Sequence, residues 1–238
     1  MKSKLFKCAL ILCLLSSGVA RGFGQGFINL GFEAANVPNL NPPDQPAYLS
    51  ISNALPGWSG SWGTTPATQV LYNDLSAGSV EIDLIGPNTD FFSNVVIAGK
   101  YTVVLQAGIA NTTSVSASIA QTGLVPAGSL SLQFAAIADL TDLAVTFNGQ
   151  NIPIQQLTSG PNYQLQRYGG DISSYAGQIG ELQFSADPNT DPFASVYLDS
   201  IIFSTLPVPE PRTLVLLAAG GGVLIARRRK NHGHENKS

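Results

Sequence analysis

Short segments of alternating apolar and polar residues recur along the middle of the chain. In the clearest one, Val80, Ile82 and Leu84 fall on one face, and Glu81 and Asp83 fall on the other. A two-residue period of this kind is the pattern of a half-buried β-strand. Comparable short runs predict further strands at residues 27–33, 69–72, 91–97, 100–110, 113–120, 130–138, 143–147, 151–157, 163–168, 180–185 and 196–204.

Turn-forming residues separate these segments, and no long helix is indicated. The chain has 24 glycines and 15 prolines, and Asn148-Gly149 between two apolar runs is the pair favoured in two-residue β-hairpin turns. No connecting segment keeps a 3.6-residue period over three turns, so β-α-β units are not expected. Residues 171–177 are a candidate for a short helix. The sequence therefore predicts an all-β fold, an antiparallel jelly-roll-type β-sandwich.

Three short motifs in this region resemble galactose-binding-like modules. They are a Phe-Glu pair at 32–33, a Leu-Pro-Gly-Trp turn at 55–58 and the closing strand 197–203. Each motif is only a few residues long. The resemblance therefore implies a fold more than it implies a ligand.

The amino terminus has the three parts of a secretory signal peptide. A start with three lysines is followed by an unbroken apolar run at 8–15 and a small-residue exit at 16–20. The apolar run is too short for a stable membrane span. We expect a signal helix that is cleaved after Ala20, with Gly24 or Gln25 as the second choice.

The exported body has neither thiol nor imidazole. Both cysteines, Cys8 and Cys13, lie within the signal segment, and both histidines, His232 and His234, lie in the carboxyl-terminal tail. Disulfides, thiolate nucleophiles and cysteine or histidine metal ligands are therefore not expected in the body. Most hydrolase and metalloenzyme chemistry is excluded with them, and we expect a protein that is not an enzyme.

The net charge of -3 conceals an uneven distribution. Residues 21–205 contain thirteen acidic and three basic residues, which gives the body a net charge of about −10, and most cations lie in the two termini. Nucleic acid is a poor partner for such a body, because phosphate neutralisation needs clustered lysine or arginine. Neutral glycans or bound cations fit better.

The carboxyl-terminal tail has three consecutive parts. Val208-Pro209-Glu210-Pro211 comes first, an apolar segment follows at 213–226, and Arg227, Arg228, Arg229 and Lys230 come next. At about 1.5 Å per residue the apolar segment spans roughly 21 Å, short of a hydrocarbon core of roughly 30 Å. One interpretation is a single weak transmembrane helix with the cations on the cytoplasmic side. The alternative is a buried helix that ends a globular domain.

The order and terminal position of these parts resemble the PEP-CTERM sorting signal of exported proteins in Gram-negative bacteria that make extracellular polysaccharide. The resemblance implies that exosortase, an integral membrane cysteine protease or transpeptidase, recognises Pro209-Glu210-Pro211. It also implies transient membrane anchoring, with the cations as the stop-transfer signal. The chain would then divide into a signal peptide (1–24), a β-sandwich ectodomain (25–205), a sorting signal (206–230) with its single transmembrane helix at 213–226, and a cytoplasmic polar tail (231–238).

The carboxylates of Glu81 and Asp83 form the first candidate site. They should project from one face of a strand, with about 7 Å between their Cα atoms. A carboxylate pair suits glycoside hydrolysis or cation binding. The alternative is a solvated strand face.

Asp187, Asn189 and Asp191 form a second candidate, because their alternation is that of oxygen ligands in a calcium loop. Pro192 and Leu198 stand where an EF-hand has its glycine and its distal glutamate, so the segment is not an EF-hand. The choice is between a structural calcium loop of another kind and a plain polar turn. No other cofactor is expected.

Trp58 and Trp62 flank a polar Ser-Gly-Ser segment and form the third candidate. An exposed indole offers a flat face on which a sugar ring packs, whereas a buried indole belongs to the core. Trp62 is the better candidate for carbohydrate binding.

Together these features predict an exported, envelope-associated protein. Its expected partners are the general secretion machinery, exosortase and, transiently, the membrane, with extracellular polysaccharide as candidate ligand. It would pass through a state tethered to the inner membrane and reach the cell surface or extracellular matrix. The alternatives are a structural component of the biofilm matrix without a ligand, and a glycan-active enzyme that uses carboxylates alone.

Overall fold

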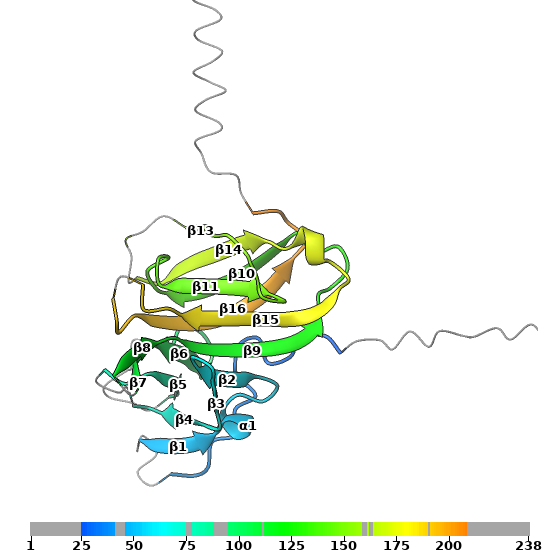
Figure 1. The fold of residues 1–238 in the computed structure, drawn as a ribbon. Coiled ribbons are helices and arrows are strands. Elements are labelled where there is room, and N and C mark those ends of the chain that lie inside the picture. Colours follow the sequence, from blue (N-terminus) through cyan, green and yellow to red (C-terminus); the bar gives the residue numbers. More distant parts are fainter. Residues whose placement is uncertain are drawn as a thin grey trace, which may run out of the picture.

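The computed structural model describes residues 25–40, 46–74, 78–87, 95–110, 112–158, 161, 164–189 and 191–208. In these ranges nearly all regular structure is β-strand, and two large sheets enclose a common core (Figure 1). The all-β prediction is confirmed.

The larger sheet has eight strands. In spatial order they are β1 (Ala47–Ser50), β4 (Gln69–Tyr72), β5 (Glu81–Ile85), β6 (Thr102–Gln106), β16 (Ser195–Ser204), β10 (Ser131–Ile137), β14 (Gln166–Asp171) and β13 (Ile154–Gln156). Neighbouring strands are antiparallel except for β4 and β5, which run parallel.

The smaller sheet has six strands, all antiparallel to their neighbours. In spatial order they are β12 (Gln150–Asn151), β11 (Leu143–Phe147), β15 (Ile179–Ala186), β9 (Ala117–Leu124), β2 (Ser59–Trp62) and β3 (Thr65–Ala67). A separate pair joins β7 (Gly108–Ala110) to β8 (Thr113–Val115), and the helical elements are α1 (Ile51–Ala54) and the 3₁₀ turn η1 (Ser173–Tyr175).

The connectivity between the sheets is that of a jelly roll. In the larger sheet β6, β16, β10 and β14 are consecutive neighbours, and in the smaller sheet β9, β15, β11 and β12 are. Between β9 and β16 the chain crosses repeatedly from one sheet to the other, so strands that are distant in sequence pair within each sheet. This arrangement agrees with the predicted sandwich.

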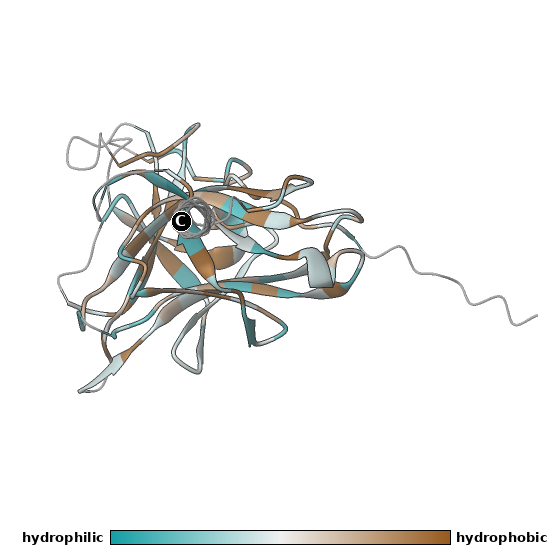
Figure 2. Ribbon diagram, turned by 90° about the horizontal axis from the view of Figure 1, so that it is seen from above, coloured by the Kyte–Doolittle hydropathy of each residue, from teal (hydrophilic) through white to brown (hydrophobic). Residues whose placement is uncertain are grey.

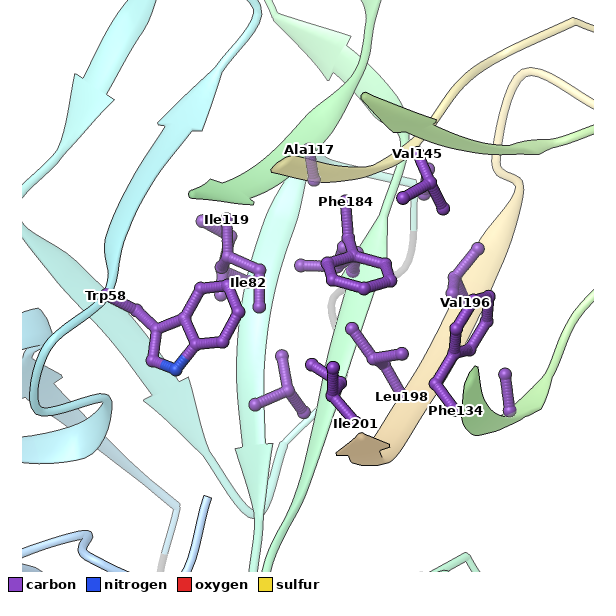
Figure 3. Close-up of a cluster of buried hydrophobic side chains, with 14 of the residues drawn as sticks. Trp58, Ile82, Ala117, Ile119, Phe134, Val145, Phe184, Val196, Leu198 and Ile201 are labelled. Atoms are coloured by element: carbon purple, nitrogen blue, oxygen red, sulfur yellow. The ribbon is translucent and has the colours of Figure 1, made fainter. Parts of the chain in front are cut away.

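Alternate residues of the strands supply the core between the sheets. Phe134 of β10 and Phe184 of β15 meet there edge to face, with ring centroids 5.2 Å apart (Figure 3). Apolar and polar positions alternate along many strands (Figure 2), as the two-residue period requires. Ile82 and Leu84 both point into this core, as their spacing predicted.

The Asn148-Gly149 hairpin turn is also confirmed. Phe147 pairs with Gln150, and the two turn residues have φ angles of 50° and 73°. Both positive angles match the two-residue turn that suits the twist of paired strands.

One predicted strand is wrong, and a second is not found in its described part. Residues 95–97, the described part of the predicted strand 91–97, form no strand. Residues 27–33 form no strand, because Asn29 and Phe32 adopt left-handed φ angles of 51° and 60°, and a strand requires strongly negative φ. The segment joins the sandwich instead through Leu30, whose carbonyl accepts a hydrogen bond from the Ile201 N–H at 2.9 Å, and just before the segment Gly26 forms a parallel bridge to Leu124. The Phe32 ring is fully buried in the core.

Helix appears in two short pieces of the described ranges. The 3₁₀ turn η1 lies within the segment where a short helix was predicted, whereas α1 was not predicted. No helix in the described ranges is long and apolar enough to cross a bilayer. The predicted signal helix (1–24) and the transmembrane sorting helix (213–226) lie outside the described residues.

Candidate functional site

The outer face of the smaller sheet carries two adjoining rows of uncharged residues over its central strands, and the exposed acid Glu181 lies beside them on β15. Core residues such as Ile119, Phe184 and Val145 point inward from these strands, so their neighbours in sequence point outward. The outward positions form two transverse rows, Ser59-Ala120-Gln183-Thr146 and Ser61-Ser118-Ser185-Ala144, which we call the neutral face.

Hydroxyl and amide groups of the neutral face bond to one another. The hydroxyls of Ser61 and Ser118 lie 2.7 Å apart, and the Gln183 amide donates to the Ser118 hydroxyl at 3.3 Å. The Ser59 hydroxyl donates to the Ala120 carbonyl at 3.1 Å. Ser118, Ala120 and Ser185 are buried, so the polar side chains that these rows expose at least in part are those of Ser59, Ser61, Gln183 and Thr146. These uncharged donors and acceptors have the chemistry that complements sugar hydroxyls.

The two tryptophans lie in different environments. Trp58 is only 5% exposed, contacts the rings of Phe32 and Phe184, and donates its indole N–H to the Asn29 carbonyl at 3.2 Å. It belongs to the core (Figure 3), so it offers no face to a sugar. Trp62 ends β2 and remains partly exposed, although it packs partly against the core. Of the pair, Trp62 alone remains a candidate for sugar contact.

Glu81 and Asp83 project from the outer face of the larger sheet, opposite the core residues Ile82 and Leu84. Asp83 lies in a transverse row between Leu71 of β4 and Val104 of β6, and Val104 is followed by Tyr197 of β16. The predicted common face is therefore present.

Asp83 is fully buried, with no exposed surface, and neither carboxylate oxygen has a hydrogen-bond partner. Burial, and then the negative charges of Glu81 and Asp74, raise the pKa of Asp83 to about 9. Burial and then the charge of Asp74 also raise the pKa of Glu81. Asp83 does not lie on a solvated strand face, and in this conformation it cannot touch a polymeric substrate.

A second pair of carboxylates, which sequence reasoning missed, fixes the segment before β6. Asp199 accepts hydrogen bonds from the Ala98 N–H at 3.0 Å and the Thr102 hydroxyl at 3.1 Å, although burial raises its pKa. Glu33 accepts from the N–H groups of Lys100 and Tyr101. These acids serve as anchors for a loop. The sign of this pair in the sequence was Asp199, a single acidic residue within the apolar closing strand 197–203.

Asp187, Asn189 and Asp191 lie in a turn, and the side chains of Asn189 and Asp191 are already hydrogen-bonded. The Asn189 side-chain amide donates to the Thr141 carbonyl at 2.8 Å, and Asp191 accepts from the Phe193 N–H at 2.9 Å. In the described part of the chain no three His, Cys, Asp or Glu side chains gather closely enough to bind a metal. Calcium binding at this turn stays an untested prediction.

Of the predicted sorting signal (206–230), the structure describes residues 206–208. Val208 is the last described residue, and Pro209, Glu210, Pro211 and the basic residues 227–230 lie outside the described ranges. Just before it, the Leu206 carbonyl accepts a hydrogen bond from the Ser131 hydroxyl at 2.7 Å. The folded body is therefore tied down almost to the start of the predicted motif.

The sequence matches no protein-family model and no curated protein. Among solved structures, the chain is similar to carbohydrate-binding modules. One is TmCBM61 in complex with β-1,4-galactotriose, with 13% identity, a TM-score of 0.40, and coverage of 76% of this chain and 99% of that one. Another is the family 11 carbohydrate-binding module from Clostridium thermocellum in complex with a mixed-linked tetrasaccharide, with 10% identity, a TM-score of 0.33, and coverage of 66% and 93%.

The K1 cleaved adhesin domain of Lys-gingipain from Porphyromonas gingivalis is also similar. It shares 13% identity at a TM-score of 0.37, over 66% of this chain and 96% of that domain. All three TM-scores are below 0.5, so these likenesses support no argument about ligands. The case for a ligand rests on the residues of this chain.

Proposed function

We propose that this chain is an exported, envelope-associated protein that exosortase sorts through its PEP-CTERM-like tail, and that its jelly-roll body binds neutral extracellular polysaccharide without cleaving it. The neutral face is the observation that most supports this binding. It offers hydroxyl and amide groups across four neighbouring strands of a body that has thirteen acidic and three basic residues between positions 21 and 205. Such a body would repel acidic polymers and tolerate neutral ones.

The burial of Asp83 supports a binding protein over an enzyme. A glycosidase needs two carboxyl groups that flank the bond they break, one as acid and one as base or nucleophile. Glu81 and Asp83 are the one acid pair that the sequence suggested for this role, and Asp83 has no surface that a glycan could touch.

The binding proposal is tested by replacing the central amide of the neutral face. Gln183→Ala removes a donor and an acceptor, and we expect affinity for neutral glucans or galactans to fall about five- to tenfold, as for one lost hydrogen bond. Gln155→Ala on β13 of the other sheet is the matched control, and an acidic polysaccharide such as alginate is the ligand control. The measurement is affinity electrophoresis of the exported protein.

The outcomes separate the competing functions. If neutral polymers still retain the Gln183→Ala variant but no longer retain the Trp62→Ala variant, the binding surface lies at the end of β2 instead. No retention on any polymer would favour a structural matrix component. Release of reducing sugar, lost in Asp83→Asn, would instead establish a glycan-active enzyme.

The sorting proposal is tested by the intact mass of the surface protein. We expect the mature chain to end near Pro211, because the apolar segment and its cations act only before processing. Surface material that retains Arg227 to Lys230 would contradict processing at this tail.

A further inference from the structure

Asp83 has unusual surroundings for a carboxyl group. Both of its oxygens are buried and have no hydrogen-bond partner, and the charged groups that shift its pKa are Glu81 and Asp74, both acidic. Lys100 and Arg167 are the basic residues of the described ranges, and neither is among the groups that influence Asp83. Burying an ionised carboxylate without a partner is costly, so such a group takes up either a proton or a cation.

The position of Glu81 points to a cation. Glu81 projects from the same face of β5, two residues away, and is half-buried. Tyr197 lies two strands away in the row of Asp83, and burial followed by the Asp83 charge raises the pKa of its hydroxyl. Two carboxylates and a phenol therefore share one patch of the outer face of the larger sheet.

We propose that Asp83 and Glu81 bind a divalent cation, calcium, on the outer face of the larger sheet. Calcium accepts six to eight oxygen ligands in flexible geometry and takes carboxylates together with carbonyl groups and water. Zinc prefers histidine and cysteine, which residues 25–208 lack, and magnesium demands stricter octahedral geometry. The Asp187 turn is the weaker position, because the Asn189 amide is already bonded to the Thr141 carbonyl and the Asp191 carboxylate to the Phe193 N–H.

The proposed site has a predictable strength and stoichiometry. No third acidic side chain of the described ranges joins the pair, so main-chain carbonyls and water must complete the shell. A site with two carboxylates belongs with extracellular modules that bind calcium at about 0.1–1 mM. Binding exchanges the Asp83 proton for the metal, and one proton passes to the solvent for each cation bound.

The test compares calcium with chelator on the exported protein at neutral pH. At about ten times the dissociation constant, we expect calcium to raise the Tm of the wild type by about 4 °C. Calorimetric titrations in two buffers of different ionisation enthalpy should show release of about one proton per cation. Asp83→Asn and Glu81→Gln should each abolish the rise in Tm, whereas Asp187→Asn should retain it.

Several results would overturn the proposal. A calcium response that survives both Asp83→Asn and Glu81→Gln would place the cation elsewhere, and a response lost only in Asp187→Asn would place it in the turn. No response of the wild type at about 10 mM calcium would mean that Asp83 keeps its proton. Terbium luminescence excited through tyrosine gives a second readout on the wild type if a variant is not recovered, and absence of sensitised emission counts against the site.

Discussion

Replacing Asp83 by asparagine should stabilise the protein when no divalent cation is present. The carboxyl group has an ordinary pKa of 3.8 and a folded-state pKa of about 9. Because the folded state binds the proton more tightly, the contribution of Asp83 to the free energy of unfolding is most favourable below about pH 4 and falls as pH rises between the two pKa values. At neutral pH the cost is about 4 kcal/mol, at about 1.4 kcal/mol for each pH unit above 3.8.

Asparagine has nearly the same shape as aspartic acid and never ionises, so it removes this cost. We expect urea unfolding in chelator to show little difference between wild type and Asp83→Asn near pH 4, and a difference that widens by about 1.4 kcal/mol per pH unit up to pH 8. Glu81, Asp74 and Tyr197 face the same region, and the raised pKa of Glu81 gives the wild type a further slope of the same sign.

Asp171 provides a control of opposite sign. Hydrogen bonds from Ser173 lower its pKa, so its contribution to stability is present above its ordinary pKa and is lost as pH falls. Asp171→Asn should therefore weaken the fold slightly at neutral pH and not in acid. A difference between wild type and Asp83→Asn that stays constant from pH 4 to 8 would refute the reasoning about burial.

Three further predictions concern the packing of the sandwich. Trp58→Ala should lower the free energy of unfolding by about 3–5 kcal/mol, because it empties a core position. Trp62→Ala should lower it clearly less, because Trp62 is partly exposed. Equal losses in urea unfolding would contradict the buried position of Trp58 and the partly exposed position of Trp62. Glu33→Ala should speed amide hydrogen exchange at Tyr101, which donates to Glu33, and unchanged exchange would show that this anchor is dispensable. Gly108→Ala should cost about 1–3 kcal/mol, because a Cβ there would overlap neighbouring main chain; a neutral result in the same unfolding assay would show that the backbone yields.

Periodicity predicted the strands well where one face of a strand meets the core. Ile82 and Leu84 of β5 and the Asn148-Gly149 turn were found where the pattern placed them, because burial and turn geometry are both local constraints. Residues 27–33 failed for a tertiary reason. Phe32 reaches the core through a left-handed backbone, so an apolar residue at the right spacing did not indicate a strand.

The candidate sites were harder to predict than the strands. The sequence placed Asp83 on the side of β5 away from the core, which is correct, but it implied contact with solvent there, which is wrong. Burial of an outward residue depends on chain that is distant in sequence, and a two-residue period contains no information about it. The neutral face was missed for a related reason, because its two rows are assembled from β2, β9, β15 and β11 only after pairing.

In the proposed tethered state, the hydrogen bond from Ser131 to the Leu206 carbonyl would set the length of the tether between the body and the membrane. Only residues 207–212 separate this fixed point from the start of the predicted membrane segment at Thr213. Fully extended, six residues reach about 20 Å. Before processing, the sandwich would thus stay within about 20 Å of the lipid surface, which is twice the spacing between two packed sheets. A sorting enzyme would have to work in that gap beside a folded domain. Inserting residues into 207–212 would therefore test whether access of the sorting enzyme to the tail limits the rate at which the protein is released from the membrane.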